Sequence, residues 1–501
     1  MSTSPEKNTL LDPNSNPSTK TEKKRRSSWS EPFSNGRFGP DEALKQAVIN
    51  MRRRQFPPSG STTPHSESEP DLDSLNPNPT DYTSLLSDEL LLKVFDKMPD
   101  PKQQLSNNSL VCRRWCAVCG KLIRSIKLID WDFLESGRLS FRFPNLVDIN
   151  LIPACIKPDR NSGILLSNKL IEVHLSSKMF LNDEFFVSKQ EILESVRIDR
   201  GVTILAEGCK KLRKIVLMNV TEEGLNCLAQ ECELLQEMEL HCCDDLSLRG
   251  IYNFKNLQIL KLIGNINGVY NSVVSDIGMT ILAQGCGRLV RLELVGCEGS
   301  YDGVKAIGQC CQMLEELTFR DHRMEGGWLS ALSYCGNLKT LVIVSCKKID
   351  ESPGLDEHLG SCVMLEELHL MRCQLRDKHS VTALFSVCRA VRKLVIEDCW
   401  GLDDGVFAAA SIFRSVRSLS LKGCTLVTTK GLESVVLSWK ELERLRVDSC
   451  NSIKDSEITA ELATLFSVLK ELKWRPDSRS MLLASLAGTE IGRKGGRSLR
   501  I

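Results

Sequence analysis

Three cysteines stand close together in the first third of the chain, at Cys112, Cys116 and Cys119. Thiolates at such spacing can share a metal ion, but a structural zinc site takes four ligands. No fourth Cys or His follows at ligand spacing, and the three cysteines fall within a helical pattern. We therefore predict no metal site at these cysteines.

Two further features have residue types that occur in enzymes. Residues 492–498, Gly-Arg-Lys-Gly-Gly-Arg-Ser, resemble a phosphate-binding loop in composition but lack its spacing and a preceding strand. The histidines are scattered, and His241 and His369 fall on expected strands, where surface or binding roles are favoured over catalysis. The sequence predicts no catalytic residue and no cofactor, so an enzyme is the least favoured class.

Basic residues gather at alternating positions near the C-terminus, opposed only by Asp448 and Glu471. Earlier in the chain, comparable positions hold glutamates, at Glu237, Glu239, Glu293, Glu316 and Glu367. Guanidinium and ammonium groups pair well with carboxylates and phosphates. A wall with such a basic end would bind an acidic or phosphorylated protein segment, and a solvated charged surface is the alternative. The candidate wall residues are Lys422, Arg444, Arg446, Lys473 and Arg475.

The element that would position these residues is a repeat with the pattern apolar-x-x-apolar-x-apolar. It recurs about fourteen times with a typical step near 25 residues, which is typical of leucine-rich repeats. Each triplet predicts a short strand, and a helical stretch follows it. Stacked strands would form a parallel sheet with helices on the other wall, a curved α/β solenoid. The triplets begin at Leu146, Leu170, Leu193, Leu212, Leu235, Leu257, Leu289, Leu314, Leu338, Leu365, Val391, Val416, Leu442 and Leu469.

The 21 cysteines follow the same repeat. One group lies three residues before the first anchor of a repeat, and a second lies three residues after the last. This periodicity predicts small buried thiols in equivalent slots rather than a disulfide scaffold, and it favours a reducing compartment. The first group is Cys209, Cys232, Cys286, Cys311, Cys335, Cys362 and Cys388; the second is Cys243, Cys297, Cys346, Cys373, Cys399, Cys424 and Cys450.

Composition limits the partners. The formal net charge is +1, which gives no overall argument for nucleic acid, and no apolar run approaches the roughly 18 to 20 residues of a membrane span. We therefore expect neither nucleic acid nor membrane as a partner, and a location in the cytoplasm, the nucleus or both. Residues 1–80 are polar and lack periodicity, so we expect disorder there; residues 481–501 predict a closing helix and a basic tail.

Residues 81–128 have a different pattern, with apolar residues about one helical turn apart. Such a unit is marginal alone and would need a partner to cover its apolar faces. Two of its segments, Leu86-Ser87-Asp88-Glu89-Leu90-Leu91-Leu92-Lys93-Val94-Phe95 and Leu110-Val111-Cys112-Arg113-Arg114-Trp115, resemble the F-box. With the cysteine-bearing repeats behind them, residues 81 to about 480 resemble F-box/leucine-rich-repeat proteins, especially a group abundant in plants.

The resemblance implies a fold and a function. The fold would be a horseshoe of the ribonuclease-inhibitor type at 140–480, preceded by a small all-α F-box domain at 81–128. The protein would be the non-catalytic substrate-recognition subunit of an SCF (Skp-cullin-F-box) ubiquitin ligase, recruiting a protein substrate for ubiquitination and proteasomal degradation. Its partners would be a Skp-type adaptor, a cullin reached through that adaptor, and the substrate.

The resemblance also implies which residues contact the adaptor or form the F-box core, without separating the two roles. These are Tyr82, Leu86, Leu90, Val94, Phe95, Met98, Leu110, Val111, Cys112 and Trp115. Ser87 departs from the family, which usually has proline there, but serine is a good helix N-cap. The alternatives are a repeat scaffold without ligase assembly and a small-molecule receptor, for which an insert near 264–275 would form the pocket.

Overall fold

The computed structural model describes residues 82–98, 101–156, 192–264, 273–354 and 359–480. All of them belong to one compact unit, residues 81–501, which is separate from residues 1–80. The expected disordered tail, the triplet that begins at Leu170, the closing helix and the basic tail lie outside the described residues. Most of the insert expected near 264–275 also lies outside them.

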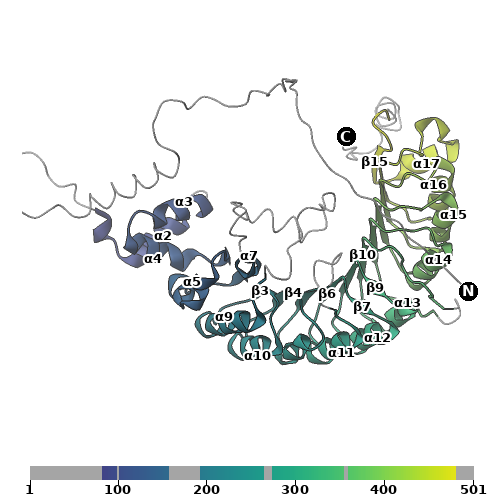
Figure 1. Cartoon of the computed structure of the whole chain (residues 1–501). Helices are drawn as coiled ribbons and strands as arrows, with labels where there is room; N and C mark the ends of the chain where they lie inside the picture. The colour runs from purple at the N-terminus through teal and green to yellow at the C-terminus, as the bar shows by residue number, and fades with distance from the viewer. Residues whose placement is uncertain (1–81, 99–100, 157–191, 265–272, 355–358, 481–501) are drawn as a thin grey trace, which may run out of the picture. The chain divides into compact units, whose positions relative to one another are not determined.

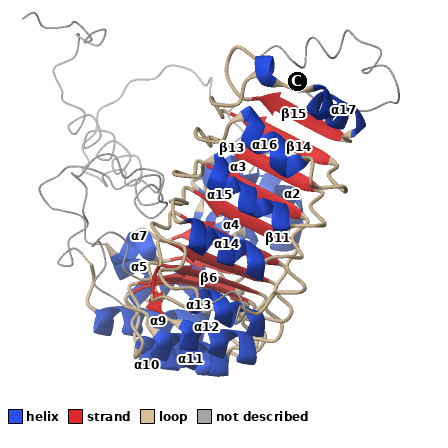
Figure 2. Cartoon of the chain, turned by 90° about the vertical axis from the view of Figure 1, so that its right-hand side faces the viewer, coloured by secondary structure: helices blue, strands red, loops and turns tan. Residues whose placement is uncertain are grey.

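The main element is a sheet of 13 parallel strands arranged in chain order, and two short strands form a second sheet. Figure 2 shows the strands of the large sheet stacked side by side along the chain. The strands of the large sheet are β1 (Ser125–Lys127), β2 (Asp148–Asn150), β3 (Lys214–Met218), β4 (Glu237–His241), β5 (Ile259–Ile263), β6 (Arg291–Val295), β8 (Glu316–Arg320), β10 (Thr340–Val344), β11 (Glu367–Met371), β12 (Lys393–Glu397), β13 (Ser418–Lys422), β14 (Arg444–Asp448) and β15 (Glu471–Arg475); β7 (Glu298–Gly299) pairs with β9 (Arg323–Met324).

Helices follow the strands and cover one side of the sheet (Figure 1). The α-helices are α2 (Asp88–Asp96), α3 (Pro101–Ser109), α4 (Arg113–Leu122), α5 (Trp131–Glu135), α6 (Arg138–Arg142), α7 (Ile152–Cys155), α9 (Ser195–Gly208), α10 (Glu222–Glu231), α11 (Asp276–Gly285), α12 (Tyr301–Cys310), α13 (Trp328–Ala331), α14 (Lys378–Val387), α15 (Asp404–Phe407), α16 (Thr429–Val436) and α17 (Ala460–Val468). The 3-10 helices are η1 (Tyr82–Leu85), η3 (Ser247–Asn253), η4 (Leu332–Tyr334), η6 (Ala408–Ile412) and η7 (Asp455–Glu457). No helix in the described ranges is long and apolar enough to cross a membrane.

The apolar triplets form the core, as the sequence predicts. In β4 and β5, for example, Leu240 and Leu262 are register partners and both are fully buried. Within the described residues, every predicted triplet coincides with a strand of the sheet except the one that begins at Leu193. Period-2 alternation places these side chains on the helix side and leaves the residues between them on the bare side of the sheet. The α/β repeat architecture is therefore confirmed for the described strands.

The triplet beginning at Leu193 was expected to be a strand, and this prediction is wrong. Helix α9 begins at Ser195, and Val196 is 78 % exposed on its first turn. The buried residues Ile198, Val202 and Leu205 follow helical spacing. Ile198 therefore fits both the strand triplet and the helical period, and the helical period decides the structure. Strand β2 pairs directly with β3, and β1 is an additional strand that the sequence did not predict.

Carboxylates link successive repeats at the starts of the helices. Asp276, in the first turn of α11, accepts hydrogen bonds from the backbone N–H and hydroxyl of Ser300, at 2.8 and 2.7 Å, and from the N–H of Gly303 at 2.9 Å. Ser300 is itself the N-cap of α12. A Cβ on Gly303 would lie 2.4 Å from the Asp276 Oδ1, so only glycine fits. The same arrangement joins Asp245 to Ser275.

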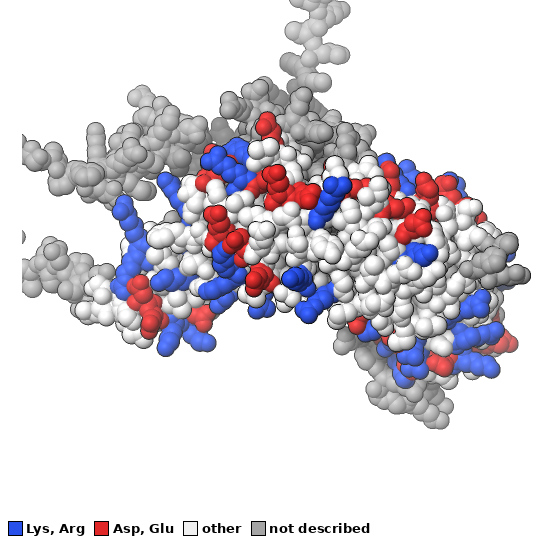
Figure 3. All heavy atoms as spheres, turned by 90° about the horizontal axis from the view of Figure 1, so that it is seen from below, with Lys and Arg blue, Asp and Glu red and all other residues white. Residues whose placement is uncertain are grey.

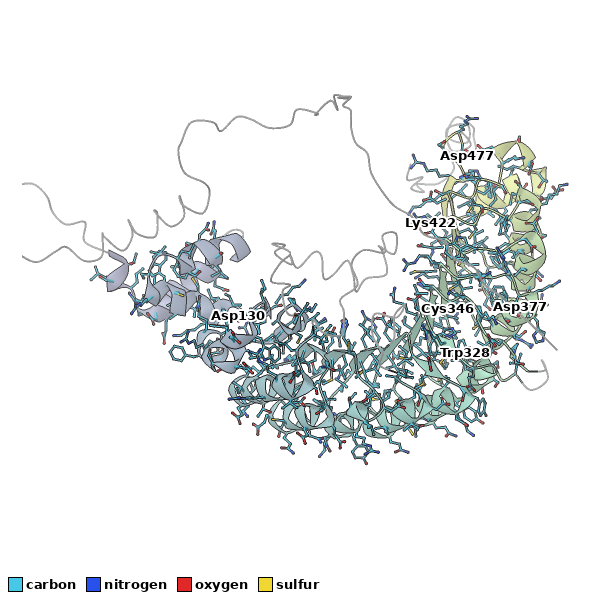
Figure 4. All side chains as sticks on the ribbon, in the orientation of Figure 1. Asp130, Trp328, Cys346, Asp377, Lys422 and Asp477 are labelled. Atoms are coloured by element: carbon cyan, nitrogen blue, oxygen red, sulfur yellow. The ribbon has the colours of Figure 1, made fainter. Side chains whose placement is uncertain are left out.

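The cysteines occupy the expected slots. All 21 are free thiols, and both predicted groups are buried. Members of the second group follow a residue that turns the chain out of its strand with positive φ, such as Ser345 (56°) before Cys346 or Asp398 (52°) before Cys399. Figure 4 shows Cys346 between the sheet and the helices. Burial raises the pKa of most of these thiols, to about 12 for Cys243, so they remain protonated.

The helical module at residues 82–122 has its own small core. Leu91, Phe95, Val118 and Cys119 are buried, and Trp115 packs edge-on against Phe95 with ring centroids 4.8 Å apart. Helices α2 and α4 supply all four buried residues. This core is separate from the one that runs through the repeats.

Candidate functional site

The helical module leaves much apolar surface in solvent. Six of its large aliphatic side chains are exposed: Leu85 (81 %), Leu86 (36 %), Leu90 (49 %), Val94 (48 %), Leu110 (83 %) and Val111 (62 %). We call these six residues the apolar surface of the module. Exposed apolar side chains gathered in one small module mark an interaction site more often than a single scattered leucine does.

The structure divides the ten predicted residues by burial. Of the ten predicted residues, Phe95 belongs to the core, and Met98 and Trp115 are partly buried against it. Leu86, Leu90, Val94, Leu110 and Val111 are exposed, and the side chain of Tyr82 lies outside the described residues.

The sequence did not predict Leu91, Val118 and Cys119 as core residues of the module, and it did not predict the exposed Leu85 as a contact residue. The spacing of Leu91 and Phe95, one helical turn apart, was the available signal for the core face of α2.

Arg114 holds the start of this module together. Its guanidinium donates to the backbone oxygen of Thr83 at 3.0 Å, to that of Leu86, and to the Asp88 carboxylate at 2.8 Å. Ser87 is the N-cap of α2 and accepts the N–H of Leu90 at 3.3 Å, as expected for a residue that replaces proline. These contacts fix the segment that carries Leu85 and Leu86.

Two of the three clustered cysteines have structural roles. The sulfur of Cys112 caps α4 by accepting the N–H of Trp115 at 3.4 Å, and Cys119 lies in the small core, where burial raises its pKa. Within the described residues, no group of three or more His, Cys, Asp or Glu side chains has the arrangement of a metal site.

The bare side of the sheet carries a ladder of ion pairs over its middle strands. Each of the five glutamates that the sequence suggested as an acidic region has a basic partner within 4.0 Å. The pairs are Lys214–Glu237, Lys261–Glu239, Lys261–Glu293, Arg320–Glu293, Arg291–Glu316 and Lys393–Glu367. The region around these five glutamates, which the sequence suggested to be acidic, is therefore a charge-balanced surface. On the helix-bearing side, Figure 3 likewise shows basic and acidic side chains interspersed.

His241 belongs to this ladder rather than to a catalytic group. It is fully buried, and its Nε2 lies 2.7 Å from the Glu239 Oε1. Burial lowers the pKa of His241. Burial alone would raise the pKa of Glu239, but the hydrogen bond with His241 and the charge of Lys261 lower it to about 2. Glu239 is thus ionised at neutral pH and is stabilised by the groups around it.

The basic wall predicted near the C-terminus lies on β13, β14 and β15, and Figure 4 shows Lys422 on the side of the sheet away from the helices. Two of its cations have acidic partners two residues away on the same strand: Arg446 with Asp448 at 3.3 Å, and Lys473 with Glu471 at 3.1 Å. Lys422, Arg444 and Arg475 have no acidic partner within 4.0 Å among the residues that the structure describes.

Comparison with known proteins gives a partial match. The chain is 27 % identical to F-box/LRR-repeat protein 4 of Bos taurus over 265 residues, which are 49 % of this chain and 38 % of that protein. No family model matches the sequence.

Among solved structures, the TLR13–ssRNA13 complex is similar over 53 % of this chain and 43 % of that one, with a TM-score of 0.33 and 17 % identity, which supports no argument. By sequence, this chain is similar over about half its length to a protein named for an F-box and leucine-rich repeats.

Proposed function

We propose that this protein is the substrate-recognition subunit of an SCF ubiquitin ligase. Its helical module would be an F-box that binds a Skp-type adaptor, and its repeats would be a leucine-rich-repeat horseshoe that holds a protein substrate. The observation that carries the proposal is the apolar surface of the module. The similarity to an F-box/LRR-repeat protein supports the same assignment.

The physical reason for a partner is the size of the module. Among the described residues, only four of the module's hydrophobic side chains are fully buried, while six large aliphatic side chains remain exposed. A unit of roughly 45 residues buries too little surface to be stable alone, so a second polypeptide that covers the exposed group adds the missing burial. At about 25 cal/mol per Å² of apolar surface, covering these side chains supplies several kcal/mol toward binding.

The mechanism needs no nucleophile in this chain. A receptor that holds a substrate lysine near a ubiquitin-charged enzyme raises the effective concentration of the two reactants. What the chain must supply is a stiff connection between adaptor and substrate. Two hydrogen bonds join the module to the segment before β2: Arg142 donates to the backbone oxygen of Cys116, and Asn145 donates to that of Lys121 at 2.8 Å.

The substrate would bind on the bare side of the repeats. There some residues between the buried anchors, such as Arg446 and Lys473, are accessible to solvent, whereas others, such as Val216, are buried. The basic wall on β13 to β15 is the candidate contact surface, since its charge is the least compensated in the described sheet. A substrate captured there would be ubiquitinated and sent to the proteasome.

A double substitution tests adaptor binding. Leu90→Glu with Val94→Glu places two charges on the apolar surface while leaving the core untouched, and glutamate keeps helix α2 intact. The variant should fold normally and lose a co-expressed Skp-type adaptor. The matched control is Leu437→Glu with Val468→Glu, two exposed aliphatic positions among the repeats, which should retain the adaptor. Equal adaptor recovery with the unaltered chain, the double variant and the control would contradict adaptor binding by this surface and favour a repeat scaffold without ligase assembly.

A further inference from the structure

We infer that β13, β14 and β15 bind an acidic protein segment in which several carboxylates are engaged separately, one by each unpaired cation. The inference rests on the proposed function, because it names the chemistry of the substrate held by the repeats. It starts from the distribution of charge on the bare side of the sheet. Elsewhere on that side, the basic side chains of β3 to β12 have acidic or other partners.

The last three strands depart from this balance. Their outward positions hold five cations, Lys422, Arg444, Arg446, Lys473 and Arg475, against two anions, Asp448 and Glu471, which leaves a net charge of +3. Asp448 is the register partner of Lys422 and Arg475, and Glu471 is that of Arg444. Each anion nevertheless lies within 4.0 Å only of a cation on its own strand.

Two neighbours in this patch also repel each other. Arg446 and Lys473 are direct register partners on adjacent strands. Like charges placed opposite each other destabilise a sheet. An acidic ligand would relieve that repulsion and would pair with the three remaining cations, so the patch is complementary to negative charge.

The spacing of the three unpaired cations favours a row of carboxylates over one phosphate. Lys422 and Arg475 lie two strands apart in the same register row, about 10 Å at the usual strand separation. Asp448 occupies the position between them, where a single phosphate would have to sit. Arg444 lies four residues before Asp448 on β14, about 13 Å from the register row that contains Lys422, Asp448 and Arg475.

Strand β13 presents Ser418 and Ser420 beside Arg444 and Arg446, so short side chains adjoin the long basic ones. An extended peptide with acidic residues at alternate positions would place one carboxylate about every 7 Å on the same side. This spacing lets successive carboxylates of the peptide reach different cations of the patch.

The test uses the full chain and fluorescence anisotropy at low salt. Four labelled probes are compared: an eight-residue peptide of alternating Glu and Ser, its Gln-Ser analogue, that analogue with one phosphoserine, and an eight-nucleotide oligo-dT. We expect the Glu-Ser peptide to bind most tightly, with binding lost at about 0.5 M salt because exposed charges are then screened.

Two triple variants locate the site. Lys422→Gln, Arg444→Gln and Arg475→Gln together should weaken the Glu-Ser peptide about tenfold or more. The control changes three exposed cations outside the sheet in the same repeats, Arg414→Gln, Lys430→Gln and Lys440→Gln, and should weaken it less than about twofold.

Four results overturn the inference: no binding by the unaltered chain, tighter binding of oligo-dT, tighter binding of the phosphoserine peptide, or equal loss in both variants. Recovery of the Skp-type adaptor with each variant is measured in parallel. Retained adaptor with absent peptide binding refutes only the acidic segment. Absent adaptor with retained peptide binding refutes the ligase assignment and leaves the acidic site standing.

Discussion

The carboxylate links between repeats predict a large effect from a single substitution at Asp276. In Asp276→Ala, the backbone N–H groups of Ser300 and Gly303 lose their acceptor, and so does the Ser300 hydroxyl. The hydroxyl can turn to water, but the two N–H groups belong to the first turn of α12 and are partly buried.

Each hydrogen bond to a charged acceptor is worth about 1.5–3 kcal/mol, so losing the two backbone bonds costs about 3–6 kcal/mol. Unfolding entropy is about 2.1 cal/mol/K per residue, which gives roughly 0.7 kcal/mol/K for a repeat array of about 350 residues. If the array unfolds as one unit, the melting temperature should fall by roughly 5 °C. Differential scanning calorimetry measures the fall, and hydrogen exchange should show faster opening at α12.

The matched control is Asp302→Ala. Asp302 is exposed in the first turn of α12 and accepts no hydrogen bond from the next repeat, so its loss should cost less than about 1 kcal/mol. A melting temperature for Asp276→Ala within 1 °C of the parent, or equal to that of Asp302→Ala, would refute the idea that the carboxylate links stabilise the array.

Three further outcomes follow from individual positions. Gly224→Ala should lower the melting temperature by several degrees, because its Cβ would lie 2.4 Å from a carboxylate oxygen of the preceding repeat, whereas Gly336→Ala, with open space around it, should not. Burial raises the pKa of Asp321 to about 6, so the folded chain holds this proton more tightly than the unfolded chain, and stability falls as pH rises from about 4 to 6. Asp321→Asn should remove that fall, raising the melting temperature at pH 7.5 but not at pH 4, in a thermal series across pH. Under native conditions a thiol reagent should modify the exposed Cys112 long before the buried Cys388, as peptide mapping by mass spectrometry would show.

The repeats could be predicted from sequence because one local rule sets both their spacing and their burial. Anchors such as Leu341 and Ile343 are separated by one residue and face one core, and each thiol slot keeps a fixed offset from them. A pattern repeated this often identifies strands that would be ambiguous alone.

The failure at Leu193 has the converse cause. A six-residue window cannot distinguish a strand triplet from the start of a helix when Ile198 and Val202 extend the apolar spacing at helical period. Strand β1 escaped prediction because it is only three residues long and its central Ile126 is only partly buried.

The sites were harder to predict than the fold. Both sides of helix α2 are apolar, so sequence alone could not tell that Phe95 faces the core while Leu90 and Val94 face solvent. The charged residues of the sheet were identified correctly as outward-facing, but their pairing depends on neighbours about 25 residues away. The register places Glu237 opposite Lys214 and Glu471 opposite Arg444, but only the first pair lies within 4.0 Å.

The most direct test of the proposed function is a calorimetric titration of the purified full chain with a purified Skp-type adaptor at several temperatures. Covering the apolar surface around Leu90 and Val94 predicts one adaptor per chain, with a binding enthalpy that becomes more negative as temperature rises. An adaptor that produces no binding signal at any temperature, with both proteins folded, would contradict the assignment of this module as an F-box.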